Sequence, residues 1–167
     1  MVKSSSTLVV GPGRCGTSLV ARHLHERGVN MGRILVPGND SNPDGHFEDA
    51  EFHWLNQGRL IERLGLVAWC AGVEALIAER TEPWGLKDPR TAEFIEDYLE
   101  LLPDARIIRC RRDRGEIIAS CCHWYGWRLA QAADLVDRRE GNLDRALDGR
   151  DVTDFICGET RLEDIHA

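Results

Sequence analysis

Two segments of the chain have the residue types and spacing that bind phosphate groups. Residues 11–18 read Gly-Pro-Gly-Arg-Cys-Gly-Thr-Ser, and a glycine-rich turn that opens a helix presents backbone N–H groups to an anion. In the nucleotide-binding pattern Gly-x-x-x-x-Gly-Lys-Ser/Thr, a lysine reaches the outer phosphates. Thr17 stands in its place, while Arg14 supplies a cation from within the loop. The segment predicts an anion site and argues against hydrolysis of ATP or GTP.

The second segment follows an apolar run near residue 110. Five arginines fall within residues 106–114, and Ser120 follows Arg112 by eight residues, about two helical turns. A guanidinium offers a bidentate fork and a serine hydroxyl one further donor, which suits a dianion with several acceptor oxygens. The pair predicts a second phosphate site.

Other residues offer proton transfer or charge stabilisation. Glu48 and His46 follow a loop rich in Gly, Pro, Asn and Asp, and each is a candidate general base if its pKa is tuned toward neutrality. Lys87 is the only lysine besides Lys3 and ends a short apolar run. An ammonium there would stabilise a departing anion, and Arg90, three residues later, is a candidate substrate contact.

Strands alternating with helices must position these residues. We expect strands at 7–10, 84–87, 105–110 and 152–157, helices at 17–27, 49–63, 70–80, 91–102 and about 116–139, and loops at 32–45 and 140–151. This order indicates an α/β sandwich with a mainly parallel sheet. In such folds, ligands bind at the carboxyl ends of the strands, and each candidate motif falls at such an end.

The composition argues against several classes of protein. The chain has 167 residues, 43% of them hydrophobic, so one domain over 1–167 is expected. Its net charge of −7 argues against a general nucleic-acid binder. Residues 1–6 show no apolar leader pattern, and the sequence has no apolar run of membrane-spanning length. The six cysteines lack CxxC or zinc spacing, so we expect no metal and packed thiols in a reducing cytoplasm.

The two phosphate motifs together resemble those of sulfotransferases that use 3′-phosphoadenosine 5′-phosphosulfate (PAPS), over roughly residues 6–124. The resemblance implies a P-loop three-layer sandwich with a central, mainly parallel sheet. It assigns the 3′-phosphate to Arg112 and Ser120, although Asp113-Arg114 stands where the family usually has Asn-Pro. It assigns the 5′-phosphosulfate to the loop residues Gly13, Arg14, Cys15, Gly16, Thr17 and Ser18.

The resemblance also implies the chemistry. A sulfuryl group would move in line from PAPS to a hydroxyl or amine of a small-molecule or carbohydrate acceptor, leaving 3′,5′-adenosine bisphosphate (PAP). Lys87 would assist the leaving group, Glu48 or His46 would take the acceptor proton, and Arg90 would position the acceptor. No metal is expected, because cationic side chains and backbone donors replace it.

Two alternatives stay open. A small P-loop nucleotide kinase would need a lysine at position 17 and a strand ending in a magnesium-binding aspartate, and only Asp88 imitates the latter. A nucleotide-binding module without catalysis fits the length of 167 residues, because sulfotransferases are generally longer. Binding of the bisphosphate without metal would distinguish a sulfotransferase from a kinase. Turnover would distinguish it from a non-catalytic module.

Overall fold

The computed structural model describes residues 6–165, and in this range the chain forms a four-stranded sheet. The strands are β1 (Ser6–Val10), β2 (Trp84–Lys87), β3 (Arg106–Arg111) and β4 (Val152–Ile156). They are all parallel and lie in the order β2-β1-β3-β4. Most of residues 1–6, where we expected no leader segment, lies outside the described residues. That residues 1–167 form one domain stays a prediction.

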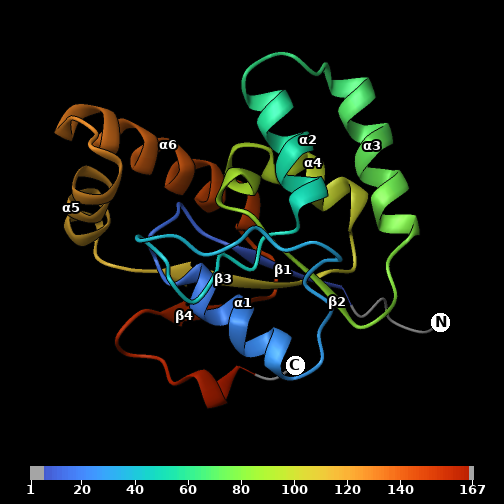
Figure 1. The fold of residues 1–167 in the computed structure, drawn as a ribbon, viewed down its shortest axis with the longest axis horizontal. Helices are drawn as coiled ribbons and strands as arrows, with labels where there is room; N and C mark the ends of the chain where they lie inside the picture. Colours follow the sequence, from blue (N-terminus) through green and yellow to red (C-terminus); the bar gives the residue numbers. More distant parts are fainter. Residues whose placement is uncertain (1–5, 166–167) are drawn as a thin grey trace.

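The helices connect the strands in the order expected of an α/β chain (Figure 1). They are α1 (Thr17–Glu26), α2 (Ala50–Leu60), α3 (Leu66–Ala78), the 3-10 helix η1 (Pro89–Glu93), α4 (Ile95–Leu101), α5 (Arg114–Tyr125), α6 (Leu129–Leu147) and the 3-10 helix η2 (Leu162–Asp164). No helix of residues 6–165 combines the length and apolarity needed to cross a membrane.

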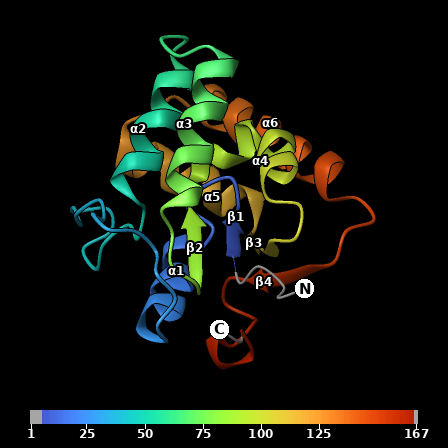
Figure 2. The same ribbon diagram turned by 90° about the vertical axis from the view of Figure 1, so that its right-hand side faces the viewer.

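Helices cover both faces of the sheet, so the molecule has three layers (Figure 2). Successive side chains of a strand point to opposite faces of its sheet, and the side chains of β1 therefore enter two different cores. Val9 joins a core with residues of α1 and α5, whereas Leu8 and Val10 join a core with residues of α2, α3 and α4. Each fully buried aliphatic side chain contributes about 1.5–3 kcal/mol. The predicted α/β sandwich with a parallel central sheet is confirmed.

Because the strands are parallel, their carboxyl ends lie along one edge of the sheet. Val9 pairs with Lys87 of β2, and Val10 pairs with Arg109 of β3. The loop after β1, the end of β2 and the loop after β3 are therefore neighbours. All three carry candidate motifs.

The region after β3 differs from the prediction. The single helix expected at 116–139 is two helices, since Gly126 (φ +65°) ends α5 in the left-handed conformation that glycine adopts most easily. The loop expected at 140–151 is largely the end of α6, where Leu143 and Leu147 are buried one turn apart. Helix α3 begins at Leu66 rather than at residue 70, and the helix expected at 91–102 is divided between η1 and α4.

Candidate functional site

The loop after β1 has the geometry of an anion cradle. Gly13 (φ +96°) and Gly16 (φ +92°) adopt left-handed conformations, and no side chain caps the start of α1. The first-turn N–H groups of a helix lack intrahelical acceptors, so the loop leaves donors available to an anion. Burial raises the pKa of Cys15 to about 11. Its thiol therefore stays protonated, and only its backbone is suited to an anion.

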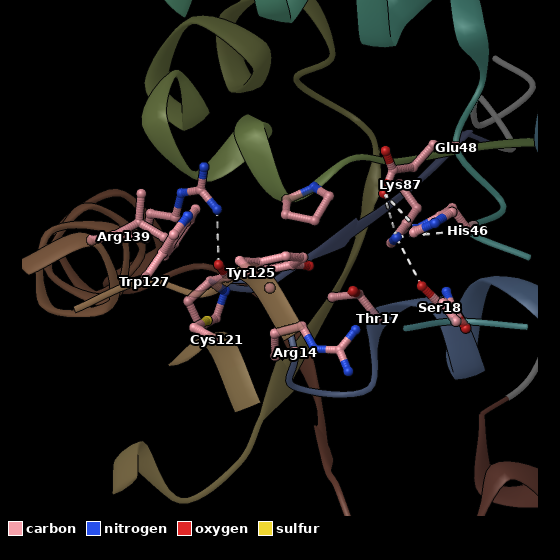
Figure 3. A pocket seen from close by; sticks show the side chains of 15 residues that line it. Arg14, Thr17, Ser18, His46, Glu48, Lys87, Cys121, Tyr125, Trp127 and Arg139 are labelled. Carbon is pink, nitrogen blue, oxygen red and sulfur yellow. Dashed lines mark hydrogen bonds and ion pairs between the residues drawn. The ribbon is translucent and has the colours of Figure 1, made fainter. Parts of the chain in front are cut away.

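Lys87 lies at one side of the site, next to Glu48, His46 and Ser18, and is almost fully buried (Figure 3). Its ammonium donates hydrogen bonds to Glu48 Oε1 at 2.7 Å, Ser18 Oγ at 2.9 Å and the His46 carbonyl at 3.0 Å. The Glu48 side chain is only 7% exposed. The structure thus brings four of the predicted site residues together, from the end of β2, the first turn of α1 and the segment before α2.

The charge of Glu48 is strongly stabilised. Burial alone would raise its pKa, but the positive charge of Lys87 and hydrogen bonds from His53 and Lys87 lower that pKa from 4.5 to about 2. A carboxylate with this pKa is a weak base while Lys87 remains in contact with it.

His46 has a different environment. Its Nδ1 lies 4.0 Å from Glu48 Oε1. Burial lowers the pKa of His46 below 6.5, with Lys87 acting in the same direction and Glu48 opposing. The imidazole is therefore largely neutral at pH 7, the form that accepts a proton.

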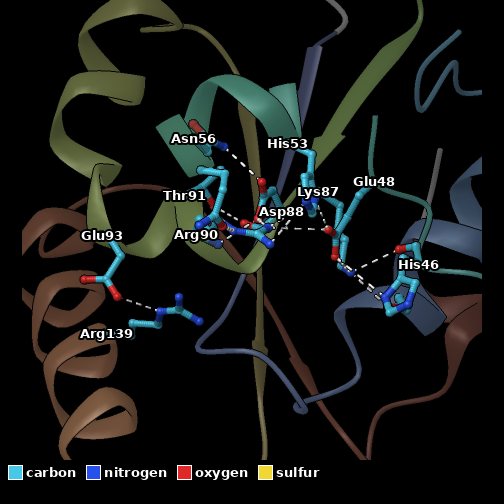
Figure 4. Close-up of polar contacts among 12 residues, drawn as sticks. His46, Glu48, His53, Asn56, Lys87, Asp88, Arg90, Thr91, Glu93 and Arg139 are labelled. Atoms are coloured by element: carbon cyan, nitrogen blue, oxygen red, sulfur yellow. Dashed lines mark hydrogen bonds and ion pairs between the residues drawn. The ribbon is translucent and has the colours of Figure 1, made fainter. Parts of the chain in front are cut away.

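Sequence reasoning missed His53, which lies on the other side of Glu48 (Figure 4). His53 Nδ1 lies 3.1 Å from Glu48 Oε2. The Arg90 guanidinium contacts the same group, with Nη1 2.8 Å from Asp88 Oδ1 and 3.6 Å from Glu48 Oε2, while Nε donates to Gln57 at 3.0 Å. The signal in the sequence that could have found His53 is its position in the first turns of α2, five residues after Glu48.

Glu48, His53 and Asp88 have ligand atoms within 4.8 Å of one another, an arrangement that can hold a metal ion. Arg90 Nη1 lies 3.6, 3.3 and 2.8 Å from atoms of these three residues. A guanidinium therefore already supplies positive charge among them.

The second predicted anion site lies directly against the first. Arg14 Nε donates to Ser120 Oγ at 2.9 Å, and Arg112 Nη1 donates to the Arg14 carbonyl at 3.3 Å. Glu116 holds Arg112 at 2.7 Å. Arg109 does not join this group, since its guanidinium contacts Glu140 and Asp144 on α6.

A cavity of about 80 Å³ lies beside the first of these sites, and neither Arg112 nor Ser120 is among the residues that line it. It is lined by predicted residues of the loop together with His46, Glu48 and Lys87, and also by Tyr125, Trp127 and Arg139, which sequence reasoning missed (Figure 3). Arg139 Nη1 donates to the Pro12 carbonyl at 2.9 Å, and its Nε contacts Glu93 at 2.9 Å (Figure 4). Arg139 thus ties α6 and η1 to the loop.

No curated protein matches this chain. A solved structure of the YorR protein from Bacillus subtilis, in complex with phosphorylated GDP, is similar over 94% of this chain and 90% of that chain, with 14% identity and a TM-score of 0.46. The model of the sulfotransferase family matches residues 7–154. The chain, with its two adjoining anion motifs, belongs to the sulfotransferase family.

Proposed function

We propose that this chain transfers a sulfuryl group from PAPS to a hydroxyl or amine of a small-molecule or carbohydrate acceptor. The observation that carries the proposal is the direct contact between the two anion motifs, Arg14 with Ser120 and Arg112 with the Arg14 carbonyl. A donor with phosphate groups at both the 5′ and 3′ positions requires two such sites side by side.

The residues of the loop fit the 5′ end of this donor. The backbone of Gly13, Cys15 and Gly16 would hold the 5′-phosphosulfate, and the hydroxyls of Thr17 and Ser18 would add donors. Arg112 and Ser120 would hold the 3′-phosphate. When bound, PAPS supplies the sulfuryl group and departs as PAP.

Lys87 would stabilise the leaving group, and Glu48 would accept the proton of the acceptor. Lys87, already hydrogen-bonded to Ser18, is placed to neutralise charge on the leaving phosphate. Any movement of Lys87 toward that phosphate would weaken its contact with Glu48 and raise the pKa of the carboxylate, making it a better base. His46 is the second candidate base, because burial keeps its imidazole neutral.

We propose that Arg90 contacts the acceptor through the 20% of its side chain that is exposed. Its guanidinium also provides local positive charge, so the proposed transfer uses no metal. The six cysteines are free thiols, which fits a reducing compartment. We therefore place the activity in the cytoplasm.

Calorimetric titration with PAP, and with ATP in the presence and absence of Mg²⁺, tests the donor class. We expect micromolar binding of PAP without metal, lost in Arg112→Ala. Arg111→Ala is the matched control, because Arg111 is the neighbouring arginine but contacts Asp154 at 2.8 Å. Binding of Mg-ATP alone would contradict the proposal and favour a kinase.

Turnover tests the chemistry. Glu48→Gln should retain PAP binding and lose most activity in an acceptor screen with PAPS. Full activity in this variant would exclude Glu48 as the base and leave His46. Binding of PAP with no turnover on any acceptor class would favour a non-catalytic module.

A further inference from the structure

A groove on the surface of α6 adjoins the cavity of the candidate site. It has a volume of about 260 Å³ and is lined by Trp127, Gln131, Asp134, Leu135 and Arg138. Trp127 and Leu135 also line the cavity. The groove and the cavity therefore share part of one wall.

The cavity has room only for the reacting end of an acceptor. Its volume of about 80 Å³ is well below the roughly 300–1,000 Å³ of pockets that enclose a whole small molecule. Lys87 and Glu48 lie on one side of it and Trp127 on the other (Figure 3). An acceptor whose hydroxyl reaches Glu48 must extend beyond the cavity, and the groove beside Trp127 offers that room.

The groove is built by the spacing of residues on one helix. Four of its lining residues are separated by three, four and seven positions, which puts their side chains on one face of α6: Gln131, Asp134, Leu135 and Arg138. Trp127, just before the helix begins, adds an indole ring that is 37% exposed. Its ring centre lies 5.1 Å from that of Tyr125, a contact that restricts its movement. The groove thus combines an apolar ring with exposed polar groups.

The charges along this face are balanced. Arg138 contacts Glu93 at 3.1 Å and Asp134 at 3.0 Å, and Arg139 contacts Glu93 at 2.9 Å. The acid is the more exposed partner in the groove, since the side chain of Asp134 is 79% exposed and that of Arg138 is 47% exposed. An anionic acceptor would meet this carboxylate beside a guanidinium that is already neutralised. The groove therefore favours an uncharged acceptor.

We propose that this groove binds the body of the acceptor, an uncharged alcohol whose ring stacks on Trp127 while Gln131 and Asp134 hydrogen-bond its other polar groups. This inference rests on the proposed function and names the acceptor class for the same site. The hydroxyl that receives the sulfuryl group enters the cavity toward Glu48. An exposed indole face binds the apolar face of a ring, and that ring is either a sugar or an aromatic ring.

Calorimetry in the presence of saturating PAP measures acceptor binding without turnover. The probe para-nitrophenyl β-glucoside carries both kinds of ring and no charge, and para-nitrophenyl β-glucuronide differs from it by one carboxylate. We expect the glucoside to bind about fivefold more tightly than the glucuronide. Methyl β-glucoside and para-nitrophenol, each with one of the two rings, then show which ring lies on Trp127.

Three variants test the residues. Trp127→Ala should weaken binding of para-nitrophenyl β-glucoside about tenfold and leave the affinity for PAP unchanged. Leu129→Ala is the matched control, because Leu129 is an apolar residue of the same segment, is 70% exposed and lines neither the cavity nor the groove. It should change neither affinity. Asp134→Asn should remove most of the preference for the glucoside over the glucuronide, and its 79% exposure keeps the test valid if Trp127→Ala does not fold.

The outcomes separate the two levels of inference. Weaker binding of PAP in Trp127→Ala would assign Trp127 to the donor and overturn the proposal. Equal affinities for the glucoside and the glucuronide, or no binding of any uncharged probe to the PAP complex, would also overturn it while the proposed function stands. Failure of the unmodified chain to bind PAP would overturn the proposed function itself.

Discussion

Replacing Glu48 by glutamine should remove a defined, pH-dependent part of the stability. The pKa of Glu48 is lowered from 4.5 to about 2 in the folded chain. Because one pH unit corresponds to about 1.4 kcal/mol, the ionised carboxylate contributes about 3 kcal/mol at pH 7. The 7% exposure of its side chain means that solvent screens this contribution little.

The sign follows from the direction of the pKa change. A carboxyl with a lower pKa in the folded state binds its proton first in the unfolded state as the pH falls. Its stabilisation is therefore complete above pH 4.5 and disappears as the pH approaches 2. About 2 kcal/mol of it should be lost between pH 7 and pH 3.

Urea denaturation at pH 7, 5 and 3 measures this effect. The free energy of unfolding of Glu48→Gln should lie about 3 kcal/mol below that of the unmodified chain at pH 7 and about 1 kcal/mol below it at pH 3. Asp134→Asn neutralises a 79% exposed carboxylate paired with Arg138, and should change stability by less than about 1 kcal/mol at both pH values. Parallel pH profiles for Glu48→Gln and the unmodified chain would refute the reasoning.

Three further predictions concern the core, the loop and the base. Asn56→Ala should lower the free energy of unfolding by about 3 kcal/mol or more in urea, because its buried amide accepts two hydrogen bonds and donates one to Asp88; a loss below 1 kcal/mol would contradict this. Gly11→Ala should weaken PAP binding in calorimetry, since its Cβ would lie 2.5 Å from a sulfur and 3.0 Å from the Cys110 carbonyl oxygen; unchanged affinity would show that the loop adapts. If His46 is the base, kcat should fall on the acid side with a midpoint below 6.5, because burial lowers its pKa, and His46→Gln should remove that limb from the pH–rate profile.

Local patterns were enough to predict the fold and the placement of the motifs. The apolar run before residues 11–16, with the glycines that follow, predicted a strand, a turn and a helix there, and Ser6–Val10 and Thr17–Glu26 confirm it. The break at Gly126 was missed because a lone glycine within a helical pattern is often tolerated.

Contacts across the sheet were beyond local reasoning. Lys87 and Glu48 were chosen separately, as a rare lysine and as an acidic residue after a loop. Their 2.7 Å ion pair joins the end of β2 to the segment before α2, across 39 residues of sequence, and only the folded chain brings these segments together. Arg139 looks like an ordinary charge on a helix, and only the packing of α6 brings it to the Pro12 carbonyl.

The guanidinium of Arg90 among Glu48, His53 and Asp88 has a consequence for how reliably the site is assembled. A divalent ion in such a place is taken from solution, and its occupancy varies with its free concentration and with pH. Arg90, in contrast, is a counterion that is part of the chain itself. It is therefore present in every folded molecule. On our proposal that the transfer uses no metal, the charge balance of these acidic groups is independent of the metal supply of the cell, and neither a chelator nor metal starvation should disturb it.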